Sequence, residues 1–379
     1  MKKIMTIVGT RPEIIKLSRV INLFDTFANH ILVHTGQNYD PVLSNVFFQD
    51  LSIRNPNYNL GVSGKNSIEI ISDVILKSYK IMNEEKPDAI LLYGDTNSCL
   101  SVISAKRLKI PVFHMEAGNR CFDQRVPEEI NRKIIDHLSD INMVLSSNAK
   151  EYLIQEGIRS DLIFNIGSHL PEVLQFYKNK IERSEIVQKL KLDKKKYFIV
   201  SMHREENVDD PNVLEKIMDS LNSVAEKYKL PIIFSTHPRT KSKIKNLKYT
   251  NYNDLIIFSS PFGFLDYIKL QIDSFMVLSD SGTVTEEAAI LGFPAITLRE
   301  AFERPEGMDT GVITISNLDK QNILEAISVC SSKEFLDLRS KSIENNLTYI
   351  PRNVSQLVLN IVFSHIDQIN RNVWKKHKL

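Results

Sequence analysis

Cysteine is scarce in this chain of 379 residues. The three cysteines, Cys99, Cys121 and Cys330, are odd in number and far apart, and none of them forms a C-x-x-C pair. This spacing argues against a disulfide framework and against a cysteine-based metal site. We therefore expect a protein of a reducing compartment, the cytoplasm, and we expect no bound metal.

Long apolar runs and an excess of basic charge are also missing. The formal net charge is +2 and charged residues make up 25% of the chain, so the basic field of a dedicated nucleic-acid-binding protein is absent. No apolar run approaches the length that spans a membrane, and the run in residues 1–10 is too short for a signal peptide. We expect neither nucleic acid nor a membrane as a partner, and we predict that the N-terminus is a buried strand.

Two glycine-rich nucleotide motifs are absent as well. No G-x-G-x-x-G follows a predicted strand, and no G-x-x-x-x-G-K-[ST] occurs in the chain. These motifs bring backbone N–H groups close to the phosphates of dinucleotides and of nucleoside triphosphates. Their absence disfavours the usual NAD-dependent enzymes and the P-loop NTPases, and we expect no cofactor.

Short β-branched or leucine-rich runs alternate with helical patterns along the chain, and each run ends in a polar turn. This alternation is typical of parallel, doubly wound sheets. The predicted strands are residues 4–8, 30–35, 89–93, 111–114, 141–145 and 162–166 in the first half, and 197–202, 231–236, 255–258, 275–279 and 294–298 in the second. The sequence therefore predicts an α/β protein with two Rossmann-like, doubly wound domains.

A lysine-rich, weakly patterned stretch at residues 178–196 separates the two series of strands. We place the first domain at residues 1–168 and the second at residues 169–353. From Val354 to Ile369, apolar residues recur three and four positions apart, which is the spacing of one helix face. We predict that the C-terminal segment, 354–379, joins the first domain.

The stretch from His114 to His137 is the most informative part of the sequence. Glu116 follows a predicted strand, and Glu128 follows a proline at a predicted helix start, where a carboxylate suits the positive end of the helix dipole. Asp95 follows the neighbouring predicted strand. Open α/β sheets bind ligands at the carboxyl ends of their strands, so these three carboxylates are candidates for proton transfer.

Structural alternatives exist for each of these carboxylates. Glu116 can form an ion pair with Arg120 or Arg125, and Glu128 can simply cap its helix. Asp95 precedes a predicted helix, where aspartate is a common capping residue. The sequence alone leaves both interpretations open.

Cationic and hydroxyl side chains follow other predicted strands. Arg11 and Lys16 lie in the first strand-to-helix turn, where backbone N–H groups already favour an anion such as a diphosphate. His203 and Arg204 follow the first strand of the second half. The structural alternative is ordinary surface charge at a helix start.

The turn at residues 279–287 is a second candidate phosphate site. Ser281, Gly282 and Thr283 offer hydroxyl and backbone N–H donors at a helix start. Glu287, one helical turn further on, suits the two hydroxyls of a ribose, because a carboxylate can accept two hydrogen bonds.

Seven motifs together resemble the non-hydrolysing UDP-N-acetylglucosamine 2-epimerase family. In chain order they are G-T-R-P-E at 9–13, G-D-T at 94–96, H-M-E-A-G at 114–118, P-E-E-I-N-R at 127–132, H-R-E-E-N at 203–207, D-S-G-T at 280–283 and E-R-P-E at 303–306. The resemblance covers nearly the whole chain. It implies the two-domain glycosyltransferase-B architecture, with UDP held mainly by the second domain and the sugar in the interdomain cleft.

The resemblance also implies roles for individual residues. Asp95, Glu116 and Glu128 would transfer protons. The substrate, a UDP-linked amino sugar, would be bound by Arg11, Lys16, His203, Arg204, Phe262, Tyr267, Ser281, Gly282, Thr283, Glu287 and Arg304. We further expect a homodimer.

The sequence departs from the commoner members of that family in the part expected to touch the sugar. The segment 36–40 reads G-Q-N-Y-D, and E-A-G is followed by N-R-C-F-D-Q-R; Phe262 and Tyr267 also differ from the usual residues. These features resemble the subgroup that converts UDP-2-acetamido-2,6-dideoxy-L-talose to UDP-N-acetyl-L-fucosamine, a step toward capsule or O-antigen precursors. The alternatives are UDP-N-acetylglucosamine 2-epimerase itself, a hydrolysing relative, a glycosyltransferase and a non-catalytic UDP-sugar sensor.

Overall fold

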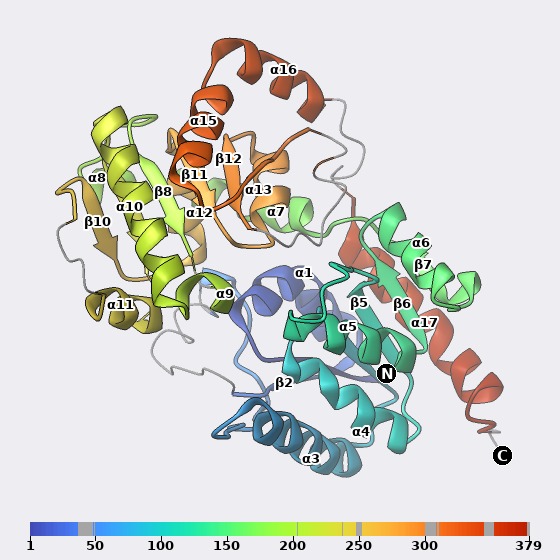
Figure 1. Cartoon of the computed structure of the whole chain (residues 1–379). Helices are drawn as coiled ribbons and strands as arrows, with labels where there is room; N and C mark the ends of the chain where they lie inside the picture. The colour runs from blue at the N-terminus through green and yellow to red at the C-terminus, as the bar shows by residue number, and fades with distance from the viewer. Residues whose placement is uncertain are drawn as a thin grey trace. The chain divides into compact units, whose positions relative to one another are not determined.

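The computed structural model describes residues 1–36, 48, 50–202, 204–236, 238–247, 252–299, 308, 311–344 and 352–376 (Figure 1). It divides into two compact units, Met1–Gln175 with Ile350–Leu379 (unit 1) and Phe176–Tyr349 (unit 2). The expected boundary at residue 168 precedes helix α7 (Leu170–Glu182), whereas the division between the units lies inside this helix.

Unit 1 is built on a parallel sheet. In the described residues this sheet has seven strands in the order β3-β2-β1-β4-β5-β6-β7. The strands are β1 (Lys3–Val8), β2 (Asn29–His34), β3 (Tyr58–Asn59), β4 (Ala89–Tyr93), β5 (Val112–Ala117), β6 (Ile141–Val144) and β7 (Ile163–Asn165). All five residues of β4 are buried, as expected for a central strand of a parallel sheet that is covered on both faces.

Helices alternate with the strands of unit 1, and the last helix of the chain, α17, also belongs to this unit. They are α1 (Arg11–Phe27), α3 (Ser67–Glu85), α4 (Val102–Arg107), α5 (Pro127–Leu138), α6 (Ser147–Gln155) and α17 (Val354–Asn372), with 3-10 turns η1 (Asn97–Ser101) and η2 (Ser160–Leu162). The sheet grows in opposite directions from β1 and β4, so the topological switch point lies between these two strands. Ligands of doubly wound sheets bind at the carboxyl side of such a point.

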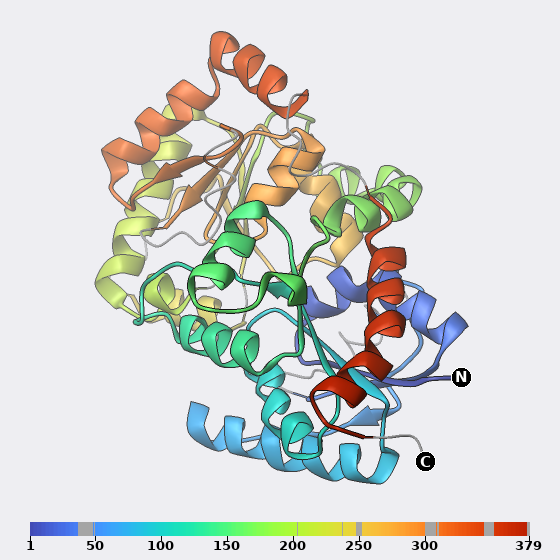
Figure 2. The ribbon, with the colours of Figure 1, turned by 90° about the vertical axis from the view of Figure 1, so that its right-hand side faces the viewer.

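The C-terminal helix α17 packs on unit 1. It lies beside α1, as Figure 2 shows for the red and blue helices. The Lys2 ammonium is 2.7 Å from the Asp367 carboxylate, and the rings of Phe164 and His365 make an edge contact with centroids 5.1 Å apart. The apolar face predicted from the sequence is the buried face of this helix.

Unit 2 repeats the same architecture with a smaller sheet. Among the described residues it has six parallel strands in the order β10-β9-β8-β11-β12-β13. The strands are β8 (Phe198–Ser201), β9 (Ile232–Ser235), β10 (Ile256–Ser259), β11 (Met276–Ser279), β12 (Ala295–Leu298) and β13 (Thr314–Ser316). The topological switch point lies between β8 and β11, where both strands run into polar turns.

The helices of unit 2 flank this sheet. They are α8 (Ile186–Lys189), α9 (Glu205–Val208), α10 (Pro211–Tyr228), α11 (Pro238–Lys245), α12 (Phe264–Asp273), α13 (Val284–Leu291), α15 (Lys320–Cys330) and α16 (Lys333–Glu344). Among the described residues of the whole chain, none of the helices combines the length and the hydropathy needed to cross a bilayer.

Candidate active site

The turn after β1 is packed tightly against the turn after β4. A Cβ atom built on Gly9 would lie 1.8 Å from Ser98 Oγ and 2.5 Å from Thr35 Oγ1, so only glycine fits at this position. The Thr35 and Ser98 hydroxyls are themselves hydrogen-bonded at 2.8 Å. This close approach brings the ends of β1, β2 and β4 together.

The buried side chain of Glu13 is hydrogen-bonded to both of these turns. Its Oε2 accepts hydrogen bonds from the backbone N–H groups of Gly9 at 2.6 Å and Thr10 at 3.3 Å, and its Oε1 accepts one from the Thr96 hydroxyl at 2.6 Å. Burial raises the pKa of Glu13 to about 7, although these donors act in the opposite direction. Glu13 is thus a structural carboxyl placed next to Asp95.

Glu116 sits in a β-bulge near the end of β5. Met115 pairs with Met143 and Ala117 with Val144, so Glu116 is the extra residue on its strand. Its φ of +61° lies in the left-handed region, which costs a residue other than glycine about 1–3 kcal/mol. Such a bulge re-aims a side chain, and the cost is consistent with a functional position.

Two donors from neighbouring elements hold the Glu116 carboxylate. The ammonium of Lys16, on α1, lies 2.8 Å from Glu116 Oε2, and the side chains of the two residues are 6% and 12% exposed. The hydroxyl of Tyr93, the last residue of β4, donates to the same oxygen. Both donors favour the ionised form of the carboxyl group.

Asp95 is held by a second cation. Its Oδ2 accepts a hydrogen bond from Arg132 Nε at 2.8 Å, and Asn131 Nδ2 donates to its backbone carbonyl at 2.9 Å. Arg132 also donates to Glu129 at 2.8 Å. The first turns of α5 therefore fix the turn that carries Asp95.

Glu128 and Glu129 have different environments, although they are neighbours on α5. Glu129 is 1% exposed and accepts hydrogen bonds from the backbone N–H groups of Cys121 and Phe122, both at 3.1 Å. Glu128 lies in the first helical turn and is partly exposed. The structure thus gives Glu129 a structural role in the loop after β5, and it leaves Glu128 accessible.

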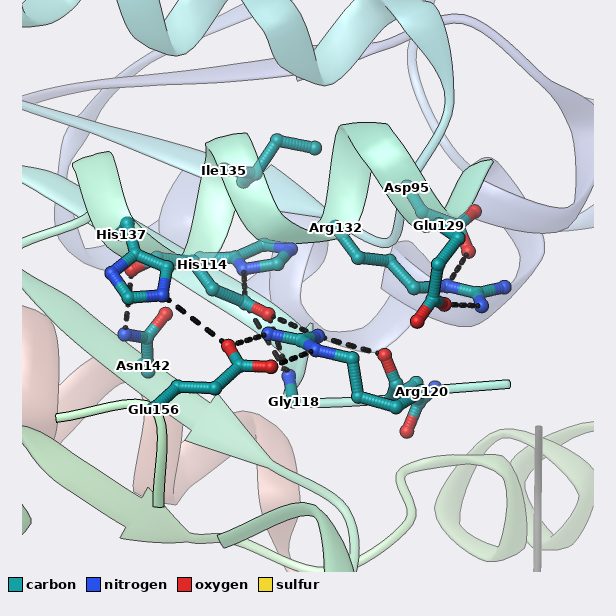
Figure 3. A network of polar contacts seen from close by, with 12 residues as sticks. Asp95, His114, Gly118, Arg120, Glu129, Arg132, Ile135, His137, Asn142 and Glu156 are labelled. Atoms are coloured by element: carbon teal, nitrogen blue, oxygen red, sulfur yellow. Dashed lines mark hydrogen bonds and ion pairs between the residues drawn. The ribbon is translucent and has the colours of Figure 1, made fainter. Parts of the chain in front are cut away.

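A buried network fixes the backbone on both sides of Glu116 (Figure 3). Asp136 accepts hydrogen bonds from His114 Nδ1 at 2.9 Å, from the Gly118 N–H at 3.2 Å and from Arg120 Nη1 at 2.7 Å. Arg120 also pairs with Glu156 through Nε at 2.8 Å and Nη2 at 2.6 Å. Arg120 therefore bonds Asp136 and Glu156, not Glu116 as the structural alternative proposed.

The same network reaches the turn of Asp95. His114 Nε2 lies 2.8 Å from the carbonyl oxygen of Gly94, the residue before Asp95. Burial raises the pKa of Asp136, but the hydrogen bonds and charges of His114 and Arg120 outweigh burial and hold this pKa below its usual range. An ionised Asp136 therefore links the two turns that carry the candidate carboxylates.

In unit 2, the turns after β8 and β11 are joined by a buried aspartate. Asp280 is 0% exposed, and its Oδ2 accepts hydrogen bonds from the backbone N–H of Arg204 and from Asn207 Nδ2, both at 3.0 Å. Asn207 also donates to the carbonyl of Leu298 at 3.2 Å. This bonding brings Arg204 next to the D-S-G-T turn.

The D-S-G-T turn leads into α13. The hydroxyls of Ser281 and Thr283 are 3.1 Å apart, and Thr283 is the residue that precedes the helix. Ser281, Gly282 and Thr283 are all partly exposed. A helix start with partly exposed hydroxyl groups is suited to an anion.

Three further residues that were predicted to bind the substrate, Phe262, Tyr267 and Glu287, lie in or next to α12 and α13. Glu287 Oε2 accepts a hydrogen bond from Gln271 Nε2 at 2.7 Å. Phe262 and Tyr267 pack on the hydrophobic core of unit 2. Burial raises the pKa of Tyr267, and the nearby Glu287 carboxylate raises it further. Tyr267 therefore lies close to Glu287 in unit 2.

Several predicted residues lie outside the described residues. These are His203, Arg304 and the segment 37–40. Arg11 is described, and it is the first residue of α1. In the part of the chain that the structure describes, no group of three or more His, Cys, Asp or Glu side chains is arranged to hold a metal ion.

Comparison with known proteins identifies the family. The family model described as UDP-N-acetylglucosamine 2-epimerase matches residues 24–362. The chain belongs to this family of isomerases.

Individual relatives of this epimerase family cover almost the whole chain. The structure of the Rickettsia bellii UDP-N-acetylglucosamine 2-epimerase is 49% identical, with a TM-score of 0.90 over 99% of this chain and 100% of that one. The Methanocaldococcus jannaschii enzyme, solved in complex with UDP-GlcNAc and UDP, is 33% identical, with a TM-score of 0.88 over 96% and 99%. The Methanococcus maripaludis UDP-N-acetylglucosamine 2-epimerase is 35% identical over 96% and 99%. The predicted glycosyltransferase-B type of fold is confirmed.

The epimerase family also includes a member that is named for a different UDP-sugar. A Pseudomonas aeruginosa relative, 33% identical over 88% of this chain and 94% of its own length, is named UDP-2,3-diacetamido-2,3-dideoxy-D-glucuronate 2-epimerase. Identity at this level therefore does not by itself decide the sugar.

Several polar residues around the candidate carboxylates were not predicted from the sequence. Arg132 and Glu129 lie inside the P-E-E-I-N-R motif, so their place in the motif was an available signal. Tyr93, whose hydroxyl donates to Glu116, and His169, which contacts Tyr93, belong to none of the seven motifs. No sequence pattern relates these two residues, because 76 positions separate them.

Proposed function

We propose that this chain interconverts UDP-N-acetylglucosamine and UDP-N-acetylmannosamine by eliminating UDP and adding it back. The observation that carries the proposal is the placement of Glu116 and Asp95 at the ends of adjacent strands, each held by a cation from another element. The relatives described as UDP-N-acetylglucosamine 2-epimerases support the choice of sugar.

Proton transfer at C2 explains the need for carboxylates. The C2 hydrogen of a nucleotide sugar is not adjacent to a carbonyl group, so simple enolisation cannot remove it. In the proposed reaction a carboxylate takes the C2 proton, the C–H electrons form the C1–C2 double bond, and the C1–O bond breaks with its electrons leaving on UDP. A carboxylic acid then returns a proton to the opposite face of C2, and UDP adds to C1.

The proposed proton-transfer groups are Asp95, Glu116 and Glu128. Glu116 accepts a hydrogen bond from the Lys16 ammonium, and Asp95 accepts one from the Arg132 guanidinium. Glu128 is accessible in the first turn of α5. General acid–base catalysis by such groups typically contributes about 10²–10⁴-fold to the rate.

The proposed UDP site uses the turns at the carboxyl side of the sheets. Ser281 and Thr283 offer exposed donors at the start of α13, and Arg204 lies at the adjoining turn. Elimination of UDP leaves a 2-acetamidoglycal, the sugar with a C1–C2 double bond. Such donors are needed to retain UDP while this intermediate exists, since loss of UDP would release the intermediate. The other residues proposed to bind the substrate are Arg11, Lys16, His203, Phe262, Tyr267, Gly282, Glu287 and Arg304.

A second candidate reaction is the epimerisation of UDP-2-acetamido-2,6-dideoxy-L-talose to UDP-N-acetyl-L-fucosamine, for capsule or O-antigen precursors. The loop after Glu116 favours it, because Phe122 in this loop is 68% exposed and an apolar side chain suits the methyl group of a 6-deoxy sugar. The names of the relatives favour the first candidate, which we therefore prefer.

A side-by-side measurement of kcat/KM on the two UDP-sugars decides between the candidates. We expect the higher value for UDP-N-acetylglucosamine. A pocket that merely tolerates an extra hydroxyl discriminates by only about a hundredfold, whereas a polar site left unfilled by a deoxy sugar rejects it much more strongly. A higher value for the 6-deoxy-L-sugar would replace the first candidate by the second, and no turnover of either would contradict both.

A further inference from the structure

Tyr93 has no role in the reaction as proposed above, yet it is hydrogen-bonded to the carboxylate of Glu116. It is the last residue of β4, only 3% exposed, and its hydroxyl donates to Glu116 Oε2. The inference below rests on the proposed epimerase reaction, because it concerns how Glu116 performs its part.

The bonds around Tyr93 have a defined direction. A tyrosine hydroxyl has one hydrogen, and here this hydrogen is donated to Glu116. His169 Nε2 lies 3.1 Å from the hydroxyl oxygen, and the His169 tautomer with a hydrogen on Nε2 donates it to Tyr93. The two hydrogen bonds therefore run in sequence from His169 through Tyr93 to the carboxylate of Glu116.

Tyr93 and His169 are both fixed by their surroundings. His169 is 1% exposed, and its carbonyl accepts the N–H of Val173 at 3.2 Å at the start of α7. Tyr93 pairs with Met115 across the sheet, next to the bulge at Glu116. The two rings meet edge to face with centroids 5.1 Å apart. The Tyr93 hydroxyl is therefore held in a fixed position from which it donates to Glu116.

The same oxygen of Glu116 also receives the ammonium of Lys16, at 2.8 Å. The Lys16 Nζ lies 5.4 Å from the centre of the Tyr93 ring, so the ring supports the cation as well as the carboxylate. Two donors from different elements on one oxygen restrict rotation of the carboxylate and favour its charged form.

We propose that Tyr93 and His169 are positioning residues that hold Glu116 ionised and in one orientation, so that Glu116 is the group that takes the proton from C2. An ionised carboxylate can accept this proton, whereas a protonated one can only supply it. Misplacement of a reacting group by about 1 Å can cost about a hundredfold in rate. The bulge and the left-handed backbone of Glu116 make an external support of this kind necessary.

Three substitutions separate positioning from general stability. Tyr93→Phe removes only the hydroxyl. His169→Leu removes the donor to Tyr93, whereas His169→Gln keeps an amide N–H near the position of Nε2.

A matched control exists elsewhere in unit 1. The hydroxyl of Tyr58 donates to Glu85, and the Lys3 ammonium lies 3.2 Å from the same carboxylate. Tyr58→Phe therefore removes the same kind of bond from a tyrosine, lysine and glutamate group that has no proposed part in the reaction.

The experiment measures kcat, KM, deuterium entry at C2 from heavy water and the Kd of UDP for each purified full-length variant. Thermal melting of each variant gives its folded fraction, and kcat is expressed per folded protein. We expect kcat to fall about ten- to a hundredfold in Tyr93→Phe and in His169→Leu, with the Kd of UDP within about twofold of the wild type. His169→Gln should stay within about threefold of the wild type, and Tyr58→Phe should not change kcat.

The double variant Tyr93→Phe/His169→Leu tests whether the two residues act through one series of hydrogen bonds. Its kcat should be no lower than that of Tyr93→Phe alone, because residues in one network are not additive. Losses that multiply, or a Tyr93→Phe enzyme within about twofold of the wild type, overturn the inference. If Tyr93→Phe does not fold, the contrast between His169→Leu and His169→Gln decides, and equal losses in the two overturn it.

Failure of the inference is distinct from failure of the proposed function. Deuterium entry in the wild type with an unaffected Tyr93→Phe overturns the inference alone. Absence of deuterium at C2 in the wild type overturns the epimerase reaction and the inference with it.

Discussion

Replacing Arg120 by methionine should destabilise unit 1 strongly. The guanidinium is buried and bonds to Asp136 and to Glu156, with three contacts between 2.6 and 2.8 Å (Figure 3). Methionine has a similar length but carries no charge, so the substitution leaves the fully buried Asp136 without its cation. Removing one partner of a buried ion pair costs about 3–5 kcal/mol.

This cost translates into a measurable shift of the melting temperature. For a protein of 150–250 residues, 1 kcal/mol corresponds to about 2–4 °C, so Arg120→Met should lower the Tm of unit 1 by about 6–20 °C. Differential scanning calorimetry of the full-length chain measures the shift.

Arg159→Met is the matched control for this prediction. Arg159 pairs with Asp161 at 2.7 Å, but the two side chains are 75% and 58% exposed. An exposed pair of this kind contributes about 0–1 kcal/mol, so the Tm should change by only a few degrees. Equal Tm shifts in Arg120→Met and Arg159→Met would refute the reasoning from burial.

Two further predictions concern the carboxyl groups of unit 1. The folded protein retains a proton on Glu13 up to about pH 7, whereas the unfolded chain loses it near pH 4.5, so the free energy of unfolding should fall by about 3 kcal/mol between these pH values. Glu13→Gln should lack this contribution, and parallel pH profiles from urea unfolding of the two proteins would contradict the assignment. Asp95→Asn should lower turnover by at least about a hundredfold with UDP binding retained; the exposed control Asp161→Asn should not, and near-normal turnover in Asp95→Asn would remove Asp95 from the proton-transfer set.

The fold could be predicted from the sequence because its signal is local. Each buried strand is a short apolar run that ends in a polar turn, and this pattern indicates parallel sheets without knowledge of distant contacts. The short strands β3 and β13 were missed, since strands of two and three residues carry little pattern. Boundaries also shifted: β5 extends to Ala117, beyond the predicted end at His114.

The details of the candidate site could not be predicted because they depend on packing between distant segments. No sequence pattern indicates the bulge that re-aims Glu116, or the contact between Tyr93 and His169. Glu128 and Glu129 are equivalent in sequence, but consecutive helical residues point about 100° apart, so only one of them faces the loop after β5.

Elimination and re-addition of UDP require exchange of the C2 hydrogen without any added cofactor. The measurement is incubation of the purified chain with UDP-N-acetylglucosamine in heavy water, without added NAD, followed by NMR and mass analysis of the UDP-sugars. We expect one deuterium at C2 of the epimerised product, because the base and the acid exchange their protons with solvent. Product formation that requires added NAD, or epimerised product that keeps the original hydrogen at C2, would contradict elimination and re-addition of UDP.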